Sequence, residues 1–186
     1  MMLGFVCHCF RTAFWTCFYR AFGRLFFAKL GKRARFEGWI DIPQRGGRVE
    51  IGNWVHVCRL VEFSVPAGGE LNIGDGAFIG RGVVISAHKR VAIAEDTMLG
   101  EFVSIHDNDH RVDRAGVAIG QQGYLAEPLE IRANCWIGAK AVLVRGSGMG
   151  ERCVLGAGAV LTKRLPAGTM AVGVPASIRE KKVAGT

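Results

Sequence analysis

The chain lacks the long apolar run that a membrane-spanning helix requires. Arg11, Arg20 and Arg24 interrupt the apolar residues near the N-terminus, so that no run reaches the roughly 20 residues that cross a bilayer. Positive charge is missing from the first residues, and no small-residue cleavage site follows them; a secretory signal peptide is therefore not expected. Proline is scarce, with five residues against 26 glycines, but 49% of the 186 residues are hydrophobic. This balance argues against a disordered chain and predicts one folded domain with an appendage.

Acidic residues are absent from the N-terminal part of the chain. Residues 1–35 contain seven basic residues, whereas the other 151 residues contain 17 basic and 16 acidic ones. The formal net charge of +8 therefore belongs to the N-terminus. A nucleic-acid-binding face on the rest of the chain is not expected, because its charges nearly balance.

Residues 1–35 are also rich in Phe, Trp and Tyr, and they predict a basic, aromatic, amphipathic helical segment. Thr16, Arg20 and Arg24 follow one another at a spacing of four residues and would form a polar stripe on this helix. Two interpretations stay open. The segment contacts the cytoplasmic face of the inner membrane as a peripheral element, or it packs against the body or between subunits.

Six cysteines are present, but their positions do not resemble a secreted disulfide framework. Cys7, Cys9 and Cys17 fall in the aromatic N-terminal run, while Cys135 and Cys153 fall where Ala or Ser would serve equally well. All six are expected to be reduced, which predicts a cytoplasmic protein.

Neither the 3.6-residue period of a helix nor the alternation of a half-buried strand describes the C-terminal half. Instead, an aliphatic residue recurs every six positions, at Ile131, Ile137, Leu143, Met149, Leu155 and Leu161. A period of six predicts a parallel β-helix, in which residues 18 apart stack on neighbouring coils at the ~4.8 Å strand spacing. The predicted fold class is therefore all-β, with a β-helix over residues 36–180 and a short tail at 181–186.

The period is interrupted twice. A shift between Ile85 and Ile93 predicts a longer corner around His88-Lys89-Arg90. Between Ile105 and Ile131 the period fails altogether, so residues 106–129 are expected to leave the β-helix as a loop. Long loops inside a compact repeat body usually carry function.

This loop begins His106-Asp107-Asn108-Asp109-His110. Histidine titrates near neutral pH and is suited to remove a proton from an attacking hydroxyl group. Asp107 or Asp109 could hold the imidazole tautomer and stabilise the imidazolium ion. The alternative without a function is that these residues form a hydrated surface loop.

Five segments occur in the order found in one enzyme family. They are Asp107–His110, Gln122-Gly123, Trp136–Ala139, Gly156–Lys163 and Gly173–Ala176. Over about residues 50–180 the chain resembles the hexapeptide-repeat O-acetyltransferases, in the branch of the galactoside, maltose and polysaccharide-biosynthesis acetyltransferases.

The resemblance implies a left-handed β-helix that forms a homotrimer, with acetyl-CoA bound in the clefts between subunits. His110 falls on the family's catalytic histidine, with Asp107 beside it and Asn108 and Asp109 toward the acceptor. Asp109 stands where the family usually has Asn. The positions that contact CoA fall on Ala139, Ala157, Thr162 and Lys163, with Arg179 on a phosphate and Trp136 shielding the rim of the cleft. The implied reaction is direct acetyl transfer to a saccharide hydroxyl, without a metal. The aromatic, basic N-terminus adds the hypothesis that the acceptor is a polysaccharide precursor linked to a lipid. No cysteine lies in the loop to suggest a covalent acetyl-enzyme.

Two other functions stay open. In a β-helical hydratase of the carbonic-anhydrase type, three histidines from neighbouring coils and subunits would bind Zn²⁺ and activate water, and His88, His106 and His110 could supply the imidazoles. In a non-catalytic scaffold, the repeat would serve assembly alone, which leaves the histidine-rich loop without a purpose.

Overall fold

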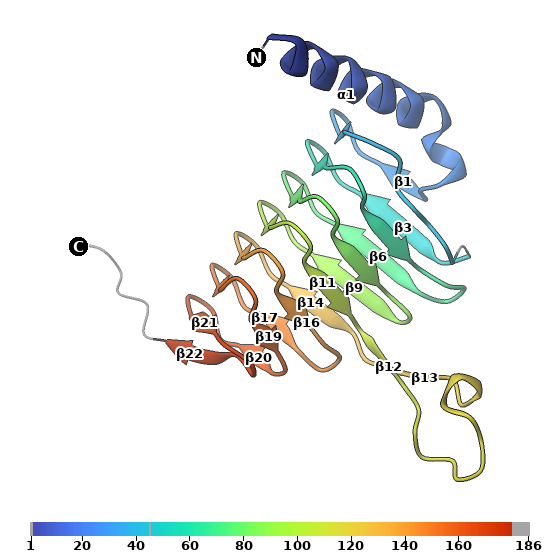
Figure 1. The fold of residues 1–186 in the computed structure, drawn as a ribbon, viewed down its shortest axis with the longest axis vertical. Coiled ribbons are helices and arrows are strands. Elements are labelled where there is room, and N and C mark those ends of the chain that lie inside the picture. The colour runs from blue at the N-terminus through green and yellow to red at the C-terminus, as the bar shows by residue number, and fades with distance from the viewer. Residues whose placement is uncertain (1, 45, 180–186) are drawn as a thin grey trace.

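A computed structural model describes residues 2–44 and 46–179 of the chain. Its body is a parallel β-solenoid with three strand-bearing faces, as the period of six predicts (Figure 1). Sheet A has seven strands, sheet B eight and sheet C five, and each of the five middle coils contributes one short strand to each sheet in turn.

The strands of sheet A are β1 Lys29–Leu30, β3 Arg48–Ile51, β6 Glu70–Ile73, β9 Arg90–Ile93, β14 Leu129–Ile131, β17 Gly148–Met149 and β20 Arg164–Leu165. Those of sheet B are β2 Arg35–Phe36, β4 His56–Val57, β7 Phe78–Ile79, β10 Met98–Leu99, β15 Trp136–Ile137, β18 Val154–Leu155, β21 Met170–Val172 and β22 Ser177–Arg179. Those of sheet C are β5 Glu62–Ser64, β8 Val84–Ser86, β11 Ser104–His106, β16 Val142–Leu143 and β19 Val160–Leu161.

The predicted stacking of residues 18 apart is confirmed. Ile131 pairs with Met149, Ile137 with Leu155, and Leu143 with Leu161. The aliphatic side chains of these ladders point inward and are almost fully buried, and each such side chain contributes about 1.5–3 kcal/mol by leaving water. The earlier coils are longer: Arg35 pairs with His56 and His56 with Phe78, which are steps of 21 and 22 residues. Their longer corners explain why the six-residue period is clear only toward the C-terminus.

Glycine is required where corners of adjacent coils approach closely. A Cβ added to Gly138 would lie 2.5 Å from the backbone nitrogen of Ala157, which is closer than any real contact. In two neighbouring coils, the corner between sheets B and C is built from Gly followed by Ala, at Gly138-Ala139 and Gly156-Ala157.

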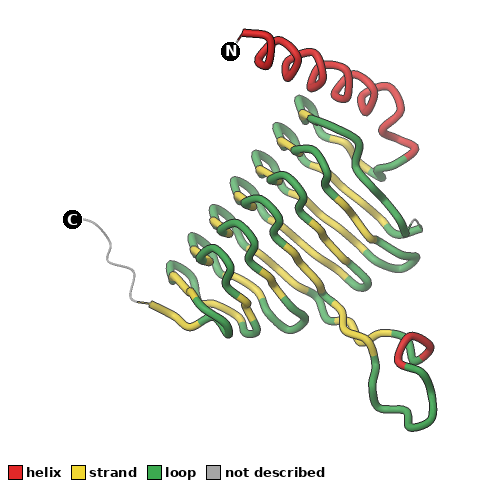
Figure 2. Tube along the Cα trace, viewed as in Figure 1, coloured by secondary structure: helices red, strands yellow, loops and turns green. Residues whose placement is uncertain are grey.

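The N-terminal helix α1 (Met2–Phe22) covers the first coil of the solenoid and continues into the 3₁₀-helix η1 (Gly23–Leu25) (Figures 1 and 2). The Tyr19 hydroxyl accepts a hydrogen bond from the Ile40 amide at 2.8 Å, and the Thr16 hydroxyl accepts one from the Phe36 amide at 3.0 Å. The helix thus satisfies backbone donors at the open end of the solenoid, which terminal units of repeat proteins must do.

Two details of the N-terminal prediction are corrected by the structure. The solenoid begins at Lys29 rather than at residue 36, because β1 pairs in parallel with β3. The strand has only two residues and lies among basic residues, so the sequence pattern does not indicate it. Thr16 does not share an exposed stripe with Arg20 and Arg24, because its side chain faces the first coil. The predicted tail 181–186 lies outside the described residues. Within the described residues, no helix is long and apolar enough to cross a bilayer.

Candidate active site

The chain makes one large excursion from the solenoid within the described residues, and it lies where the failed period predicts it. His106 still belongs to β11 and Leu129 already belongs to β14, so the excursion comprises residues 107–128. Strands β12 (Asn108–His110) and β13 (Tyr124–Ala126) form an antiparallel hairpin that projects from the body (Figure 1). Beyond it, the chain closes through the 3₁₀-helix η2 (Ile119–Gln121).

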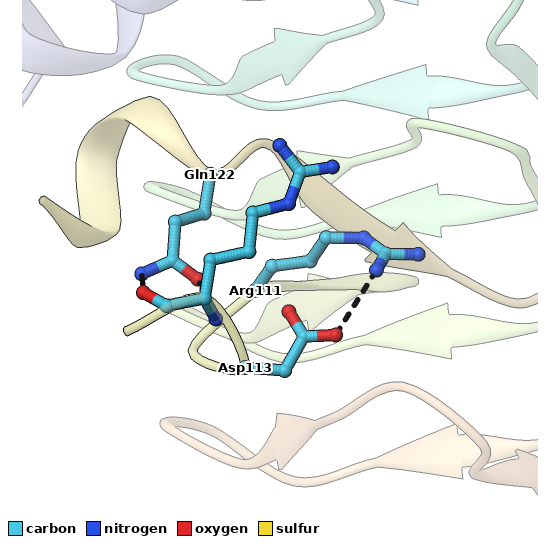
Figure 3. A network of polar contacts seen from close by, with 4 residues as sticks. Arg111, Asp113 and Gln122 are labelled. Carbon is cyan, nitrogen blue, oxygen red and sulfur yellow. Dashed lines mark hydrogen bonds and ion pairs between the residues drawn. The ribbon is translucent and has the colours of Figure 1, made fainter. Parts of the chain in front are cut away.

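The far end of the excursion is closed by a buried glutamine. The Gln122 side-chain oxygen accepts a hydrogen bond from the Arg114 amide at 2.9 Å, and its nitrogen donates to the carbonyls of Arg114 and Val117 at 3.2 and 2.8 Å. Figure 3 shows this amide beside the Arg111–Asp113 ion pair, whose N–O distance is 3.2 Å. A single side chain here replaces the backbone pairing that a strand would have supplied.

A pocket of about 460 Å³ lies at the base of the hairpin. Its lining includes the three histidines of the predicted site and polar residues from two coils: His88, His106, His110, Ser86, Asn108 and Asp109. The ends of β8 and β11 and the hairpin therefore converge here, although they are distant in sequence.

His110 lies on β12 opposite Tyr124 on β13, and both side chains are exposed at the pocket. The Tyr124 ring lies 4.4 Å from the ring of His110 and 4.3 Å from that of His88, measured between centroids. One aromatic ring thus contacts two imidazoles and restricts where each can lie.

The other two imidazoles are more deeply placed. His106 Nε2 lies 2.7 Å from the Ser104 hydroxyl. Burial lowers the pKa of His106 and of His88 below the ordinary value, although Asp107 opposes this effect in both cases. Both rings therefore favour the neutral form at neutral pH.

Asp107 is held by backbone amides. The carboxylate is completely buried and accepts hydrogen bonds from the backbone amides of His88, Lys89 and Arg90, each at 2.8 Å. Within the described residues, it makes no hydrogen bond to an imidazole. Its contacts build the corner that carries His88.

The neighbouring residues predicted to face the acceptor both line the pocket. Asn108 accepts a hydrogen bond from the Ser86 hydroxyl at 2.9 Å. Asp109 forms an ion pair with Arg145, whose Nε lies 2.8 Å from the carboxylate, and the same guanidinium also pairs with Glu127.

Sequence reasoning missed Arg145 and Tyr124. Arg145 lies 36 residues from Asp109 and 18 from Glu127, so nothing local in the sequence connects them. For Tyr124 a weak signal existed, since it directly follows the Gln122-Gly123 pair and is the only aromatic residue of the loop sequence 107–128.

The residues expected to contact CoA fall into two groups in one protomer. Ala139 and Ala157 occupy the corner between sheets B and C, and Trp136 and Arg179 lie exposed on sheet B. Thr162 and Lys163 lie exposed at the opposite edge of sheet C, in the corner that follows β19. This second corner adjoins the histidine pocket, because Val144, one coil earlier in the same register, lines that pocket.

The surroundings of both groups suit an acyl-CoA. Small residues leave the backbone accessible at the first corner, Trp136 presents an apolar face, and Lys163 offers a cation for a phosphate. A protomer on its own, however, holds the two groups on different edges of sheet C.

The histidine pocket does not have the geometry of a metal centre in one protomer. Among the described residues, only Glu37, His56 and Cys58 bring three metal-ligating atoms within 4.8 Å of one another. They lie on sheet B, away from His88, His106 and His110.

Comparison with known proteins also identifies a hexapeptide repeat in this chain. The family profile named hexapeptide repeat of succinyl-transferase matches residues 128–163. A Mycobacterium tuberculosis protein named probable acetyltransferase Rv3034c is 33% identical over 149 residues, which cover 80% of this chain and 48% of that protein. Nodulation protein L of Rhizobium meliloti is 35% identical over 117 residues, 63% of each chain. The chain thus spans less than two thirds of the length of these relatives.

Solved structures share the fold. AntD, an N-acyltransferase of Bacillus cereus solved with dTDP and coenzyme A, superposes with a TM-score of 0.75 at 15% identity, covering 87% of this chain and 88% of AntD. The hexapeptide-repeat acetyltransferase VCA0836 of Vibrio cholerae, solved with acetyl coenzyme A, gives a TM-score of 0.61 at 23% identity over 89% of this chain and 76% of that one.

Proposed function

We propose that the chain transfers an acetyl group from acetyl-CoA to a hydroxyl group of a saccharide, because its repeat matches the hexapeptide-repeat profile and its sequence is similar to that of a probable acetyltransferase. The observation that carries this proposal is the placement of His110. Its imidazole is exposed at the pocket, on the large excursion, and is held beside Tyr124.

In this proposal, His110 accepts the proton of the acceptor hydroxyl as its oxygen attacks the thioester carbonyl. A backbone N–H of the adjoining corner donates a hydrogen bond to the oxyanion that forms. His110 then gives its proton to the departing thiolate. The acetyl group passes directly to the acceptor, so no side chain of the protein is acetylated.

In this proposal, the residues of the hairpin bind the acceptor, and the two groups of residues described above bind the cofactor. Asn108 and Asp109 face the acceptor, whose hydroxyl groups match their polar side chains. Trp136, Ala139 and Ala157 would bind the pantetheine arm, and Lys163 and Arg179 would meet phosphates, with Thr162 beside them. Since one protomer separates these groups, we propose a homotrimer in which neighbouring subunits together complete each site.

The test is acetyl transfer from labelled acetyl-CoA to a panel of saccharides, with parent, His110→Gln and His56→Gln proteins. We expect His110→Gln to lower kcat/KM by about 10²–10⁴-fold, the usual contribution of a general base. His56 Nε2 lies 3.0 Å from the Glu37 carboxylate, outside the pocket, so His56→Gln is the matched control and should retain activity.

Three outcomes would contradict the proposal: full activity of the His110→Gln protein, equal loss in both variants, or no transfer to any saccharide. The product also shows whether oxygen or nitrogen of the acceptor is acetylated. Mild base hydrolyses an ester and releases acetate, whereas it leaves an amide intact. An amide product would mean that the acceptor is an amino sugar rather than a saccharide hydroxyl.

A further inference from the structure

The end of the solenoid opposite its C-terminal coils carries a second, unassigned groove. It has a volume of about 750 Å³ and lies between helix α1 with η1 and the first coil. Five cations line it, namely Arg20, Arg24, Lys29, Lys32 and Arg33, and its lining contains no acidic residue.

Most of these cations have no acidic partner. Arg20, Arg24 and Lys32 form no ion pair with any described residue. Arg33 is positioned by its guanidinium lying over the Trp54 ring, 4.3 Å from the centroid. Lys29 is the exception, since it stands opposite Glu50 in the pairing of β1 with β3. Unpaired cations gathered in a concave site attract a multivalent anion such as a phosphate group.

The face of α1 that points away from the solenoid is apolar. Phe10 and Phe14 are 73% and 62% exposed, and Leu25 in η1 is 75% exposed. With the exposed Cys17 and Ala21, these residues recur at the spacing of one helix face. We call these five residues the apolar stripe. Arg20 and Arg24 are exposed beside it.

An apolar stripe bordered by arginines fits the boundary between headgroups and acyl chains of a bilayer. The other face of α1 packs against the solenoid, to which Tyr19 and Thr16 form hydrogen bonds. These contacts fix the helix in an orientation that exposes the apolar stripe to solvent. The excess of basic residues in this part of the chain complements an anionic surface.

We propose that this groove binds the phosphate groups of anionic lipids, so that the protein docks on a membrane surface with the apolar stripe of α1 inserted at the headgroup level. The docking site is independent of the proposed acetyl transfer, because it can be measured without acetyl-CoA.

The experiment is co-flotation of the full chain with vesicles of phosphatidylcholine alone or of phosphatidylcholine mixed with phosphatidylglycerol. We expect binding to the anionic vesicles only, and weakening by salt. Arg20→Gln/Arg24→Gln should bind roughly thirtyfold more weakly, the loss expected for two cations at an anionic surface. Arg59→Gln/Arg164→Gln removes two exposed arginines outside the groove and should bind like the parent.

A second variant tests the apolar stripe. Phe10→Ser/Phe14→Ser should lose vesicle binding while keeping the oligomeric state of the parent. If this variant instead changes the oligomeric state, the stripe is a subunit contact and the proposal fails. The proposal also fails if the two double arginine variants weaken vesicle binding equally, or if the protein binds soluble phosphate but does not bind anionic vesicles.

Discussion

A buried carboxylate organises the corner beside the histidine pocket. Asp107 lies at the end of β11 and accepts three backbone N–H groups from the preceding coil. The carboxylate is the acceptor for these amides, and burying them without an acceptor would cost free energy. The longer corner around His88 therefore depends on a side chain that the next coil provides.

The contacts of Asp107 predict a structural effect. We expect Asp107→Asn to lower the free energy of unfolding by roughly 3 kcal/mol, because an amide offers one acceptor oxygen and turns N–H donors toward N–H donors. Asp109→Asn, on the exposed neighbouring carboxylate, should cost less than about 1 kcal/mol. Urea denaturation of both variants measures the difference. An Asp107→Asn protein as stable as the parent but inactive would instead favour the catalytic role that the sequence suggests.

The hairpin of β12 and β13 is fastened to the solenoid by Arg145. This residue lies in the corner after β16 and pairs with Asp109 on one hairpin strand and with Glu127 just beyond the other. One guanidinium thus spans both strands near the point where they leave the body. His110 is on the clamped hairpin, so its position depends on this contact.

Removing the clamp should affect catalysis more than folding. Arg145→Met keeps the aliphatic length and loses both ion pairs, and we expect kcat/KM for acetyl transfer to fall about tenfold because His110 is less well positioned. The free energy of unfolding should change by less than about 1 kcal/mol. Hydrogen exchange should increase in residues 107–128 only. Arg48→Met, which breaks the exposed pair with Glu50 on sheet A, serves as the control; equal effects of the two variants would contradict the clamp.

The inward ladders and the excursion differ in how far sequence predicts them. Ile137 and Leu155 repeat at a fixed spacing, so their burial and stacking are predictable from periodicity alone. The excursion has no repeat. Its form depends on Gln122 bonding across a loop and on Arg145 reaching another coil, and these contacts form only when the solenoid has placed the partners. The sequence therefore indicates that the histidines lie close together, whereas it gives no sign of the hydrogen bonds between Asp107 and the backbone of the preceding corner.

At the scale of the molecule, the outer face of sheet B carries an apolar ladder. Phe78, Met98, Trp136, Val154 and Met170 are in register on successive strands and point outward. Met98 and Trp136 are about half exposed, at 51% and 55%. An apolar ladder of this length favours contact with another copy of the chain. In the homotrimer proposed above, such contact is the way in which the sheet B residues proposed to bind the cofactor would reach the histidine pocket of a neighbouring subunit.

Shared sites can be tested by mixing two inactive variants. His110→Ala removes the proposed base, and Ala157→Trp blocks the corner of sheets B and C; each homotrimer should be inactive. In trimers assembled from equal amounts of both, about a quarter of the sites would pair an intact histidine pocket with an intact corner, if each site spans two subunits. Acetyl transfer should then recover to about that fraction of the parent rate. If each protomer held a complete site, every site in the mixture would carry one defect and no activity would return. The double variant His110→Ala/Ala157→Trp mixed with parent controls for assembly, which sedimentation measures.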